Sequence, residues 1–143
     1  MKEKNIQAEH LSFKTSCHSV EEAARTVNAS PEDFVKNICL MDTEKKLIVA
    51  IVKGEDRIST KKIGKILDIE RPKTATPQEI LEKTGYICGG VPSFGYTATF
   101  LIDARVMDKE IIYSGGGSEN SLIKLSPVEL QKANQGQIAR IRK

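Results

Sequence analysis

The sequence predicts a single α+β domain over residues 1–143, and three observations support this. A length of 143 residues suits one domain with a sizeable core. Segments with the apolar pattern of strands alternate with segments that begin at helix-capping residues. The composition, 39% hydrophobic and 29% charged, is that of an ordinary globular protein. About five to seven strands are expected, and local patterns do not order them within a sheet.

Helix starts mark the first part of the chain, and two neighbouring strands follow them. Residues 6–13 fit either a short helix or a strand. Ser19 is a possible N-cap for a helix at 20–27, and Ser30-Pro31 begins a second, short helix. The expected strands are residues 35–41 and 46–52, joined by a hairpin turn at 42–45.

Three further helix starts carry a Ser or Thr cap. These helices are expected at residues 59–67, at 76–84 and from Ser126 onward. Gly85 is expected to stop the second of them in the left-handed conformation. Strands are expected at residues 97–102, 110–114 and 122–125, with a return to extended structure at 138–141.

The chain has no feature of an exported or membrane-spanning protein. No apolar run approaches the roughly 18 residues needed to cross a bilayer. The first five residues are not followed by an apolar signal segment. The three cysteines, Cys17, Cys39 and Cys88, lack the spacing of metal ligands and fit reduced thiols. A cytoplasmic location is therefore expected, with no membrane partner.

The positive charge permits an RNA partner without predicting one. The formal net charge is +3, and many enzymes that do not bind RNA carry such a charge. Basic residues gather at Lys61, Lys62 and Lys65 and again at Arg140, Arg142 and Lys143. Each cluster taken alone is more often a solvated face or a tail. The absence of tryptophan makes an extensive base-stacking platform unfavourable.

Two glycine-rich segments are the strongest local indication of a binding site. They are residues 85–95 and 114–118, and they contain seven of the ten glycines. Such loops let backbone amides approach a ligand, and amides stabilise phosphates and developing oxyanions. The second segment lacks the Lys-Ser/Thr ending of a P-loop and the pattern of a dinucleotide site. Ordinary turns are the alternative interpretation of both.

Four motifs, taken together in this order, resemble one family. They are Lys36 within Phe-Val-Lys-Asn, the 85–95 segment, the 114–118 segment and Leu-Ser-Pro-Val-Glu-Leu at 125–130. They are similar to the YbaK/ProX-type aminoacyl-tRNA editing domains, which are related to the insertion domain of bacterial prolyl-tRNA synthetase. The resemblance extends from about residue 18 to about residue 139. It implies a mixed, barrel-like sheet with flanking helices, and no metal or organic cofactor.

The resemblance also implies an activity and a set of site residues. Free-standing members hydrolyse wrongly charged tRNA, chiefly alanyl- or cysteinyl-tRNA for proline. The implied catalytic residues are Lys36, Gly89 and Gly90, with water as the nucleophile. The residues expected to contact the substrate are His18, Val91, Pro92, Ser93, Phe94, Gly95, Ser114, Gly115, Gly116 and Gly117. The lysines expected to contact tRNA phosphates are Lys61, Lys62 and Lys65.

Several alternatives stay open at this point. Lys36 could instead face water at a strand edge or pair with Glu32 or Asp33. The family often has Gly-x-x-x-Pro, which would place proline at residue 93, whereas this chain has Pro92 followed by Ser93. The identity of the amino acid removed is therefore undetermined.

Two residues near these segments have expected structural roles. Asn37 is expected to be structural, and Asp103 either braces a glycine loop or forms a strand-end turn.

The expected partners are the 3′ end of misacylated tRNA and, as a second candidate, prolyl-tRNA synthetase. Two other functions compete with editing. One is a module that binds a tRNA end or a synthetase without catalysis. The other is a hydrolase for a small ester or thioester.

Overall fold

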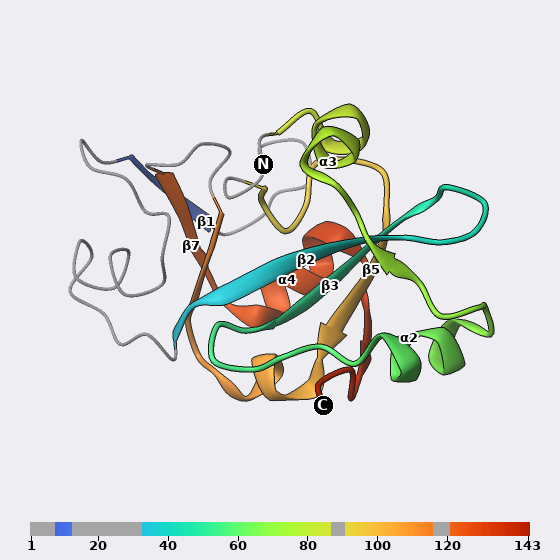
Figure 1. Cartoon of the computed structure of the whole chain (residues 1–143). Helices are drawn as coiled ribbons and strands as arrows, with labels where there is room; N and C mark the ends of the chain where they lie inside the picture. The colour runs from blue at the N-terminus through green and yellow to red at the C-terminus, as the bar shows by residue number, and fades with distance from the viewer. Residues whose placement is uncertain (1–7, 13–32, 87–90, 116–120) are drawn as a thin grey trace.

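The computed structural model describes residues 8–12, 33–86, 91–115 and 121–143 (Figure 1). The expected helix at 20–27 and the helix start at Ser30 lie outside these ranges. Within them, no helix combines the length and the apolar character that a membrane crossing requires.

The α+β class is confirmed, and the larger sheet is mixed. Its five strands lie in the order β4-β2-β3-β5-β8. Their bounds are β2 Val35–Met41, β3 Leu47–Lys53, β4 Lys73–Thr74, β5 Thr99–Asp103 and β8 Gln137–Ala139. Strand β2 is antiparallel to both β3 and β4, whereas the β3–β5 and β5–β8 pairs are parallel.

A second, antiparallel sheet has three strands in the order β1-β7-β6. These strands are β1 Ala8–Ser12, β6 Ile112–Gly115 and β7 Ser121–Leu125. The two sheets meet where Phe34, directly before β2, forms a parallel bridge with Tyr113 of β6. The two rings stack with their centroids 4.9 Å apart. This junction brings the start of β2 next to β6 (Figure 1).

Strand β3 lies at the centre of the core because both of its faces are covered. All seven of its residues are buried, which explains its continuous apolar run. Val49 and Ile51 belong to the apolar cluster that includes residues of β6, β7 and the helix that follows β7. Ile48 and Val52 point to the other face, where Ile63 and Ile141 pack.

In the described ranges, four helical segments accompany the sheets. They are α2 Thr60–Leu67, α3 Pro77–Thr84, the 3-10 helix η3 Ala104–Asp108 and α4 Pro127–Asn134. The predicted caps are confirmed: Ser59, Thr76 and Ser126 each accept a hydrogen bond from a backbone amide in the first turn. Gly85 ends α3 with φ at 80°, as its position predicted.

The strand predictions hold for the longer strands and fail for the short one. Residues 35–41 form β2 as expected, and the ambiguous segment 6–13 contains strand β1. The described residues contain eight strands, more than the five to seven expected. Strand β4 was missed because it has two exposed residues and so no apolar alternation to detect.

Candidate functional site

Three polar side chains from distant segments meet beside the start of β2. The Asn37 Nδ2 group donates to the Val91 carbonyl at 2.8 Å and to Ser114 Oγ at 3.3 Å. The Ser93 hydroxyl donates to Asn37 Oδ1 at 2.7 Å and also bonds to the Ser114 hydroxyl. Ser93 and Ser114 are buried, with 0% and 1% of their surfaces exposed. Both predicted glycine-rich segments are therefore joined to β2 through Asn37.

The donors and acceptors of these three side chains form a closed ring. Since the Ser93 hydrogen goes to Asn37 Oδ1, the Ser114 hydroxyl must donate to Ser93 Oγ. The Asn37 amide then completes the ring by donating to Ser114 Oγ. A buried polar group is costly unless it is paired, and here each hydroxyl both donates and accepts. We refer to Asn37, Ser93 and Ser114 as the polar ring.

The backbone of residues 91–93 is held by side chains at every carbonyl. Beyond the bond from Asn37 to Val91, the Tyr96 hydroxyl donates to the Pro92 carbonyl at 2.7 Å. The Asn134 Nδ2 group of α4 donates to the Ser93 carbonyl at 2.9 Å. Burial raises the pKa of Tyr96, so its hydroxyl stays protonated and remains a donor.

The segment that these bonds hold is buried from Val91 to Phe94 and becomes exposed at Gly95. Residues 91–94 are buried, and Gly95 follows with φ at 98°, in the left-handed region. Ser93 stands where the family's pattern would have proline, and its hydroxyl bonds to two other segments. Ser93 therefore ties this backbone to β2 and β6 by hydrogen bonds.

Five predicted site residues lie outside the described ranges. They are His18, Gly89, Gly90, Gly116 and Gly117. Of the others, the structure brings together Val91, Ser93 and Ser114 directly, with Pro92, Phe94, Gly95 and Gly115 adjacent along the chain.

Lys36 projects from the face of β2 opposite to the polar ring. Neighbouring residues on a strand point to opposite faces, and Asn37 points toward Val91 and Ser114. Lys36 is half-buried, and its cross-strand partner Val52 belongs to the cluster beneath α2.

Charged neighbours of Lys36 lie in the loop after β3. Burial and then the Arg57 guanidinium hold the pKa of Lys36 below its usual value, and Asp56 partly opposes them. Of the two alternative partners, Asp33 forms an ion pair with Lys109 at 3.2 Å and not with Lys36, and Glu32 lies outside the described residues. Within the described part of the chain, Asp56 Oδ2 is buried without a hydrogen-bond partner.

The three lysines predicted to contact phosphates lie on α2 in two different environments. Lys61 and Lys65 are exposed. Lys62 Nζ donates to the Arg142 carbonyl at 2.9 Å, so this ammonium holds the C-terminal segment.

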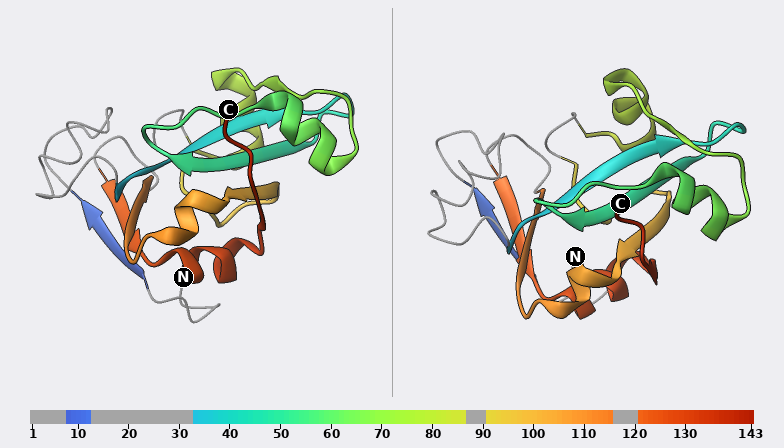
Figure 2. Two further views of the ribbon diagram at one scale, coloured as in Figure 1. Left: turned by 90° about the horizontal axis from the view of Figure 1, so that it is seen from below. Right: turned by 60° about the horizontal axis from the view of Figure 1, so that its bottom comes forward.

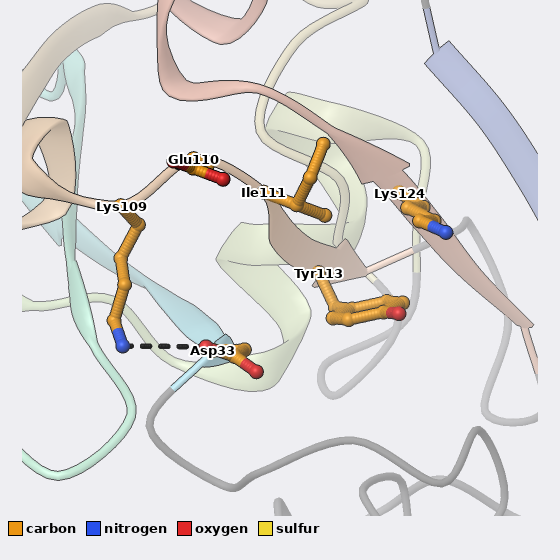
Figure 3. A pocket seen from close by; sticks show the side chains of 6 residues that line it. All are labelled: Asp33, Lys109, Glu110, Ile111, Tyr113 and Lys124. Carbon is orange, nitrogen blue, oxygen red and sulfur yellow. Dashed lines mark hydrogen bonds and ion pairs between the residues drawn. The ribbon is translucent and has the colours of Figure 1, made fainter.

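A separate open pocket of about 330 Å³ lies at the junction of the two sheets (Figure 3). Its lining residues are Asp33, Lys109, Glu110, Ile111, Tyr113 and Lys124. None of the predicted site residues lines it. Tyr113 precedes Ser114 on β6, so its ring and the polar ring occupy opposite faces of that strand. Among the described residues, no group of three or more His, Cys, Asp or Glu side chains could hold a metal ion.

Comparison with known proteins assigns the chain to a family. A model of the aminoacyl-tRNA editing domain matches residues 14–133. The chain belongs to the aminoacyl-tRNA editing domain family. The match spans β2 to most of α4, and so includes every described residue of the polar ring.

Relatives of this editing domain include both free-standing and fused proteins. YwhH of Bacillus subtilis (strain 168), an uncharacterized protein, is 28% identical over 130 residues, covering 90% of this chain and 82% of YwhH. The proline–tRNA ligase of Lactobacillus helveticus (strain DPC 4571) is 26% identical over 103 residues. That match covers 71% of this chain but only 18% of the ligase, so the likeness concerns one part of a much larger enzyme.

Solved structures share the fold over almost the full length. The crystal structure of the hypothetical protein APE2540 superimposes with a TM-score of 0.91 at 25% identity, covering 99% of this chain and 95% of that one. A structure described as a candidate trans-editing enzyme for prolyl-tRNA synthetase gives a TM-score of 0.88 at 24% identity, covering 95% and 87%. These likenesses establish the fold of the editing domain.

Sequence reasoning did not identify the partners of Asn37 and did not find Tyr96 or Asn134. Asn37 was expected to be structural, and it joins two of the segments predicted to form the site. The available signal was its place on the strand: Asn37 alternates with Val35 and Cys39, both in the core. A polar side chain at a core-facing position needs a buried partner, which the sequence alone did not identify.

Proposed function

We propose that this editing domain acts in trans and hydrolyses the ester bond of misacylated proline tRNA, with alanyl- or cysteinyl-tRNA as the substrate. Membership of the aminoacyl-tRNA editing domain family supports the reaction class. The likeness to part of a proline–tRNA ligase supports the choice of tRNA. A synthetase pocket built for proline excludes a smaller amino acid weakly, since one methylene is worth only about 1–3 kcal/mol. A second site that removes the error is therefore needed.

In the proposed reaction, water attacks the carbonyl carbon of the ester. The bond from this carbon to the ribose oxygen then breaks, and the ribose oxygen takes up a proton. Free amino acid and uncharged tRNA are the products. The backbone amides of Gly89 and Gly90 are proposed to stabilise the oxyanion, and loss of one such donor costs about 2.7–4 kcal/mol of transition-state stabilisation. No protein nucleophile is required, because the ester is already activated.

The observation that carries this proposal is the polar ring. The ring fixes Val91 and Ser93 against β2 and β6. Val91 directly follows Gly89 and Gly90, the two proposed oxyanion donors, in the sequence. Catalytic donors work best when they are held in place before the substrate arrives, because no reorganisation is then needed. Phe94 and Val91, both buried here, are proposed as walls that limit the size of the amino acid.

Lys36 is proposed to contact the terminal phosphate or ribose of the tRNA. Its place on the opposite face of β2 from the polar ring favours contact with the nucleic acid over contact with the amino acid. The nearby Arg57 adds a second positive charge on the same side.

The experiment that tests the proposed function is deacylation of a panel of charged proline tRNAs. Alanyl-, cysteinyl-, seryl- and prolyl-tRNA should be compared at equal concentration. We expect rapid hydrolysis of the alanyl or cysteinyl species and sparing of prolyl-tRNA. If a folded protein hydrolyses none of them but still binds the tRNA, the binding-module function replaces the enzyme. Cleavage of free small esters without any preference for tRNA would instead support the small-ester hydrolase.

Replacing Asn37 with alanine should destabilise the protein by about 1–3 kcal/mol. The change leaves the Val91 carbonyl and the Ser93 hydroxyl without their partner, and a buried polar group without a partner costs about that much. The free energy of unfolding in urea measures the effect. Gln78→Ala is the matched control, because Gln78 is an exposed amide on α3.

A double-mutant cycle tests whether the ring acts as a unit. Ser93→Ala removes the hydroxyl that loses its acceptor in Asn37→Ala, so the double variant should lose less stability than the sum of the two single variants. Strict additivity would show that Asn37 and Ser93 are energetically independent.

A further inference from the structure

Two basic segments that are far apart in the sequence form one surface. The first is residues 57–65, which lead into and include most of α2, and the second is residues 140–143 at the C-terminus. Ile58 and Arg142 form an antiparallel bridge. Figure 2 shows the C-terminal trace ending beside the segment that precedes α2. The resemblance implied phosphate contacts for Lys61, Lys62 and Lys65 but none for the C-terminal cluster, and the pairing of the two segments is visible only in the fold.

Several hydrogen bonds hold the two segments together. Ser59 N donates to the Ile141 carbonyl at 2.7 Å, and Lys143 N donates to the Arg57 carbonyl at 2.8 Å. The Lys62 ammonium bonds to the Arg142 carbonyl. Beneath them, the buried Asp103 carboxylate accepts from the backbone amides of Ile141 and Arg142. The surface is therefore preorganised, since its backbone is paired on both segments.

The exposed charges of this surface are all positive. They belong to Arg57, Lys61, Lys65, Arg140 and Lys143. No Asp or Glu occurs in residues 57–67 or 135–143. The acidic groups beneath the surface are already engaged, because Asp103 bonds Arg142 and Asp56 bonds Arg105. The other acidic residues nearest along the chain are Glu55, which pairs with Lys53 at 2.8 Å, and Asp68 and Glu70, which lie beyond the end of α2.

The spacing of the α2 lysines adds an energetic argument. Lys61 and Lys65 are four residues apart on a helix, so their side chains project from one face. Like charges at this spacing destabilise an isolated helix by about 0.2–0.5 kcal/mol. A polyanion lying across them would relieve this repulsion, and the phosphates of a nucleic acid are spaced closely enough to meet several such cations.

We propose that the sugar-phosphate backbone of a folded RNA binds a surface formed by Arg57, Lys61, Lys65, Arg140 and Lys143. This proposal rests on the proposed function, because the RNA is the tRNA substrate. We call these five residues the basic surface. The face of β2 that carries Lys36 is the one that packs toward α2, so an RNA strand on the basic surface passes toward Lys36. After burial, the Arg57 charge is the second cause that lowers the pKa of Lys36, so Arg57 lies close enough to act on this lysine. Contacts to phosphates position the substrate and carry no sequence preference of their own.

The test is the salt dependence of binding to uncharged proline tRNA, measured by fluorescence anisotropy. Each phosphate contact contributes about −0.9 to the slope of log K against log salt. The double variants Lys61→Gln/Lys65→Gln and Arg140→Gln/Lys143→Gln should each bind more weakly and lower the magnitude of this slope by about 2, one for each lost contact. The matched control is Lys45→Gln/Lys132→Gln, which removes two exposed lysines from the β2–β3 turn and from α4. The control should keep the slope of the unmodified protein.

The outcomes separate this proposal from the proposed function. If the basic-surface variants bind tRNA with the same affinity and slope as the control, the surface does not bind RNA, even if deacylation proceeds normally. If the magnitude of the salt slope falls as expected but no charged tRNA is hydrolysed, the proposal that this surface binds RNA is supported and the deacylase function is wrong. If both are right, the variants should raise KM for misacylated tRNA far more than they lower kcat. Binding that is lost equally in the control would indicate a general charge effect and would overturn the assignment to this surface.

Discussion

Replacing Lys36 with alanine should lower the turnover of misacylated tRNA by about 100- to 1,000-fold. Loss of one well-placed electrostatic donor has an effect of this size. Lys36 is half-buried on β2, and its pKa is lowered by burial and by Arg57. Single-turnover deacylation of alanyl- and cysteinyl-tRNA measures the loss.

The control for Lys36 must separate charge from folding. Lys36→Met keeps the aliphatic stem over the strand and removes only the ammonium, so it should be as inactive as Lys36→Ala. Lys132→Ala, at an exposed position on α4, should retain full turnover. The melting temperature of all three should stay close to that of the unmodified protein, because no ion pair or hydrogen bond joins the Lys36 side chain to another described residue. If Lys36→Met remains fully active, Lys36 is an ordinary strand-edge lysine and hydrolysis depends on the backbone amides alone.

Replacing Asp103 with alanine should destabilise the protein by about 3–5 kcal/mol, because it breaks an ion pair whose carboxylate is buried and removes the charge-assisted hydrogen bonds to that carboxylate. The Asp103 side chain is fully buried and accepts four hydrogen bonds. Its partners are the backbone amides of Arg105, Ile141 and Arg142 and the Arg142 guanidinium. The buried amide of Ile141 would lose its acceptor. A fall in melting temperature on the order of 10 °C is expected for a chain of this size.

Two further variants define what Asp103 contributes. Asp103→Asn keeps an acceptor oxygen for the Ile141 and Arg142 amides but places an NH₂ group beside the Arg142 guanidinium, so its cost should lie between those of the unmodified protein and Asp103→Ala. Asp108→Ala removes an exposed carboxylate from the same region and should change the free energy of unfolding by less than about 0.5 kcal/mol. A cost for Asp103→Ala as small as that of Asp108→Ala would show that the C-terminal segment docks without this carboxylate.

Local sequence signals were reliable where they had a local physical cause. The caps Ser59, Thr76 and Ser126 were found because each satisfies backbone amides a few residues away. Strand β3 was found because residues 47–52, which are buried on both faces, are all apolar. The segment 6–13 remained ambiguous because its strand is defined by pairing with β7, which is more than a hundred residues later.

The role of Asp103 shows the limit of this reasoning. The sequence indicated a strand-end turn or a brace for a glycine loop, and the turn is present as the bond from the Arg105 amide. Asp103 does not brace a described glycine loop. Its carboxylate accepts hydrogen bonds from the backbone amides of residues 141 and 142 and so holds the C-terminal segment. A carboxylate after an apolar strand has several possible partners, and only the packing of the chain selects one of them.

The sequence by itself determined the α+β class, the positions of the capped helices and the longer strands, and the resemblance to the editing family. These follow from periodicity, capping chemistry and motif order, which depend on the types and spacing of residues along the chain and not on which distant segments come into contact. Only the tertiary structure decided that the strands divide into two sheets, that Asn37 closes a polar ring with Ser93 and Ser114, and that the basic segments at 57–65 and 140–143 lie side by side. Each of these depends on hydrogen bonds between residues more than fifty positions apart, and no local preference specifies which distant partner such a bond will find.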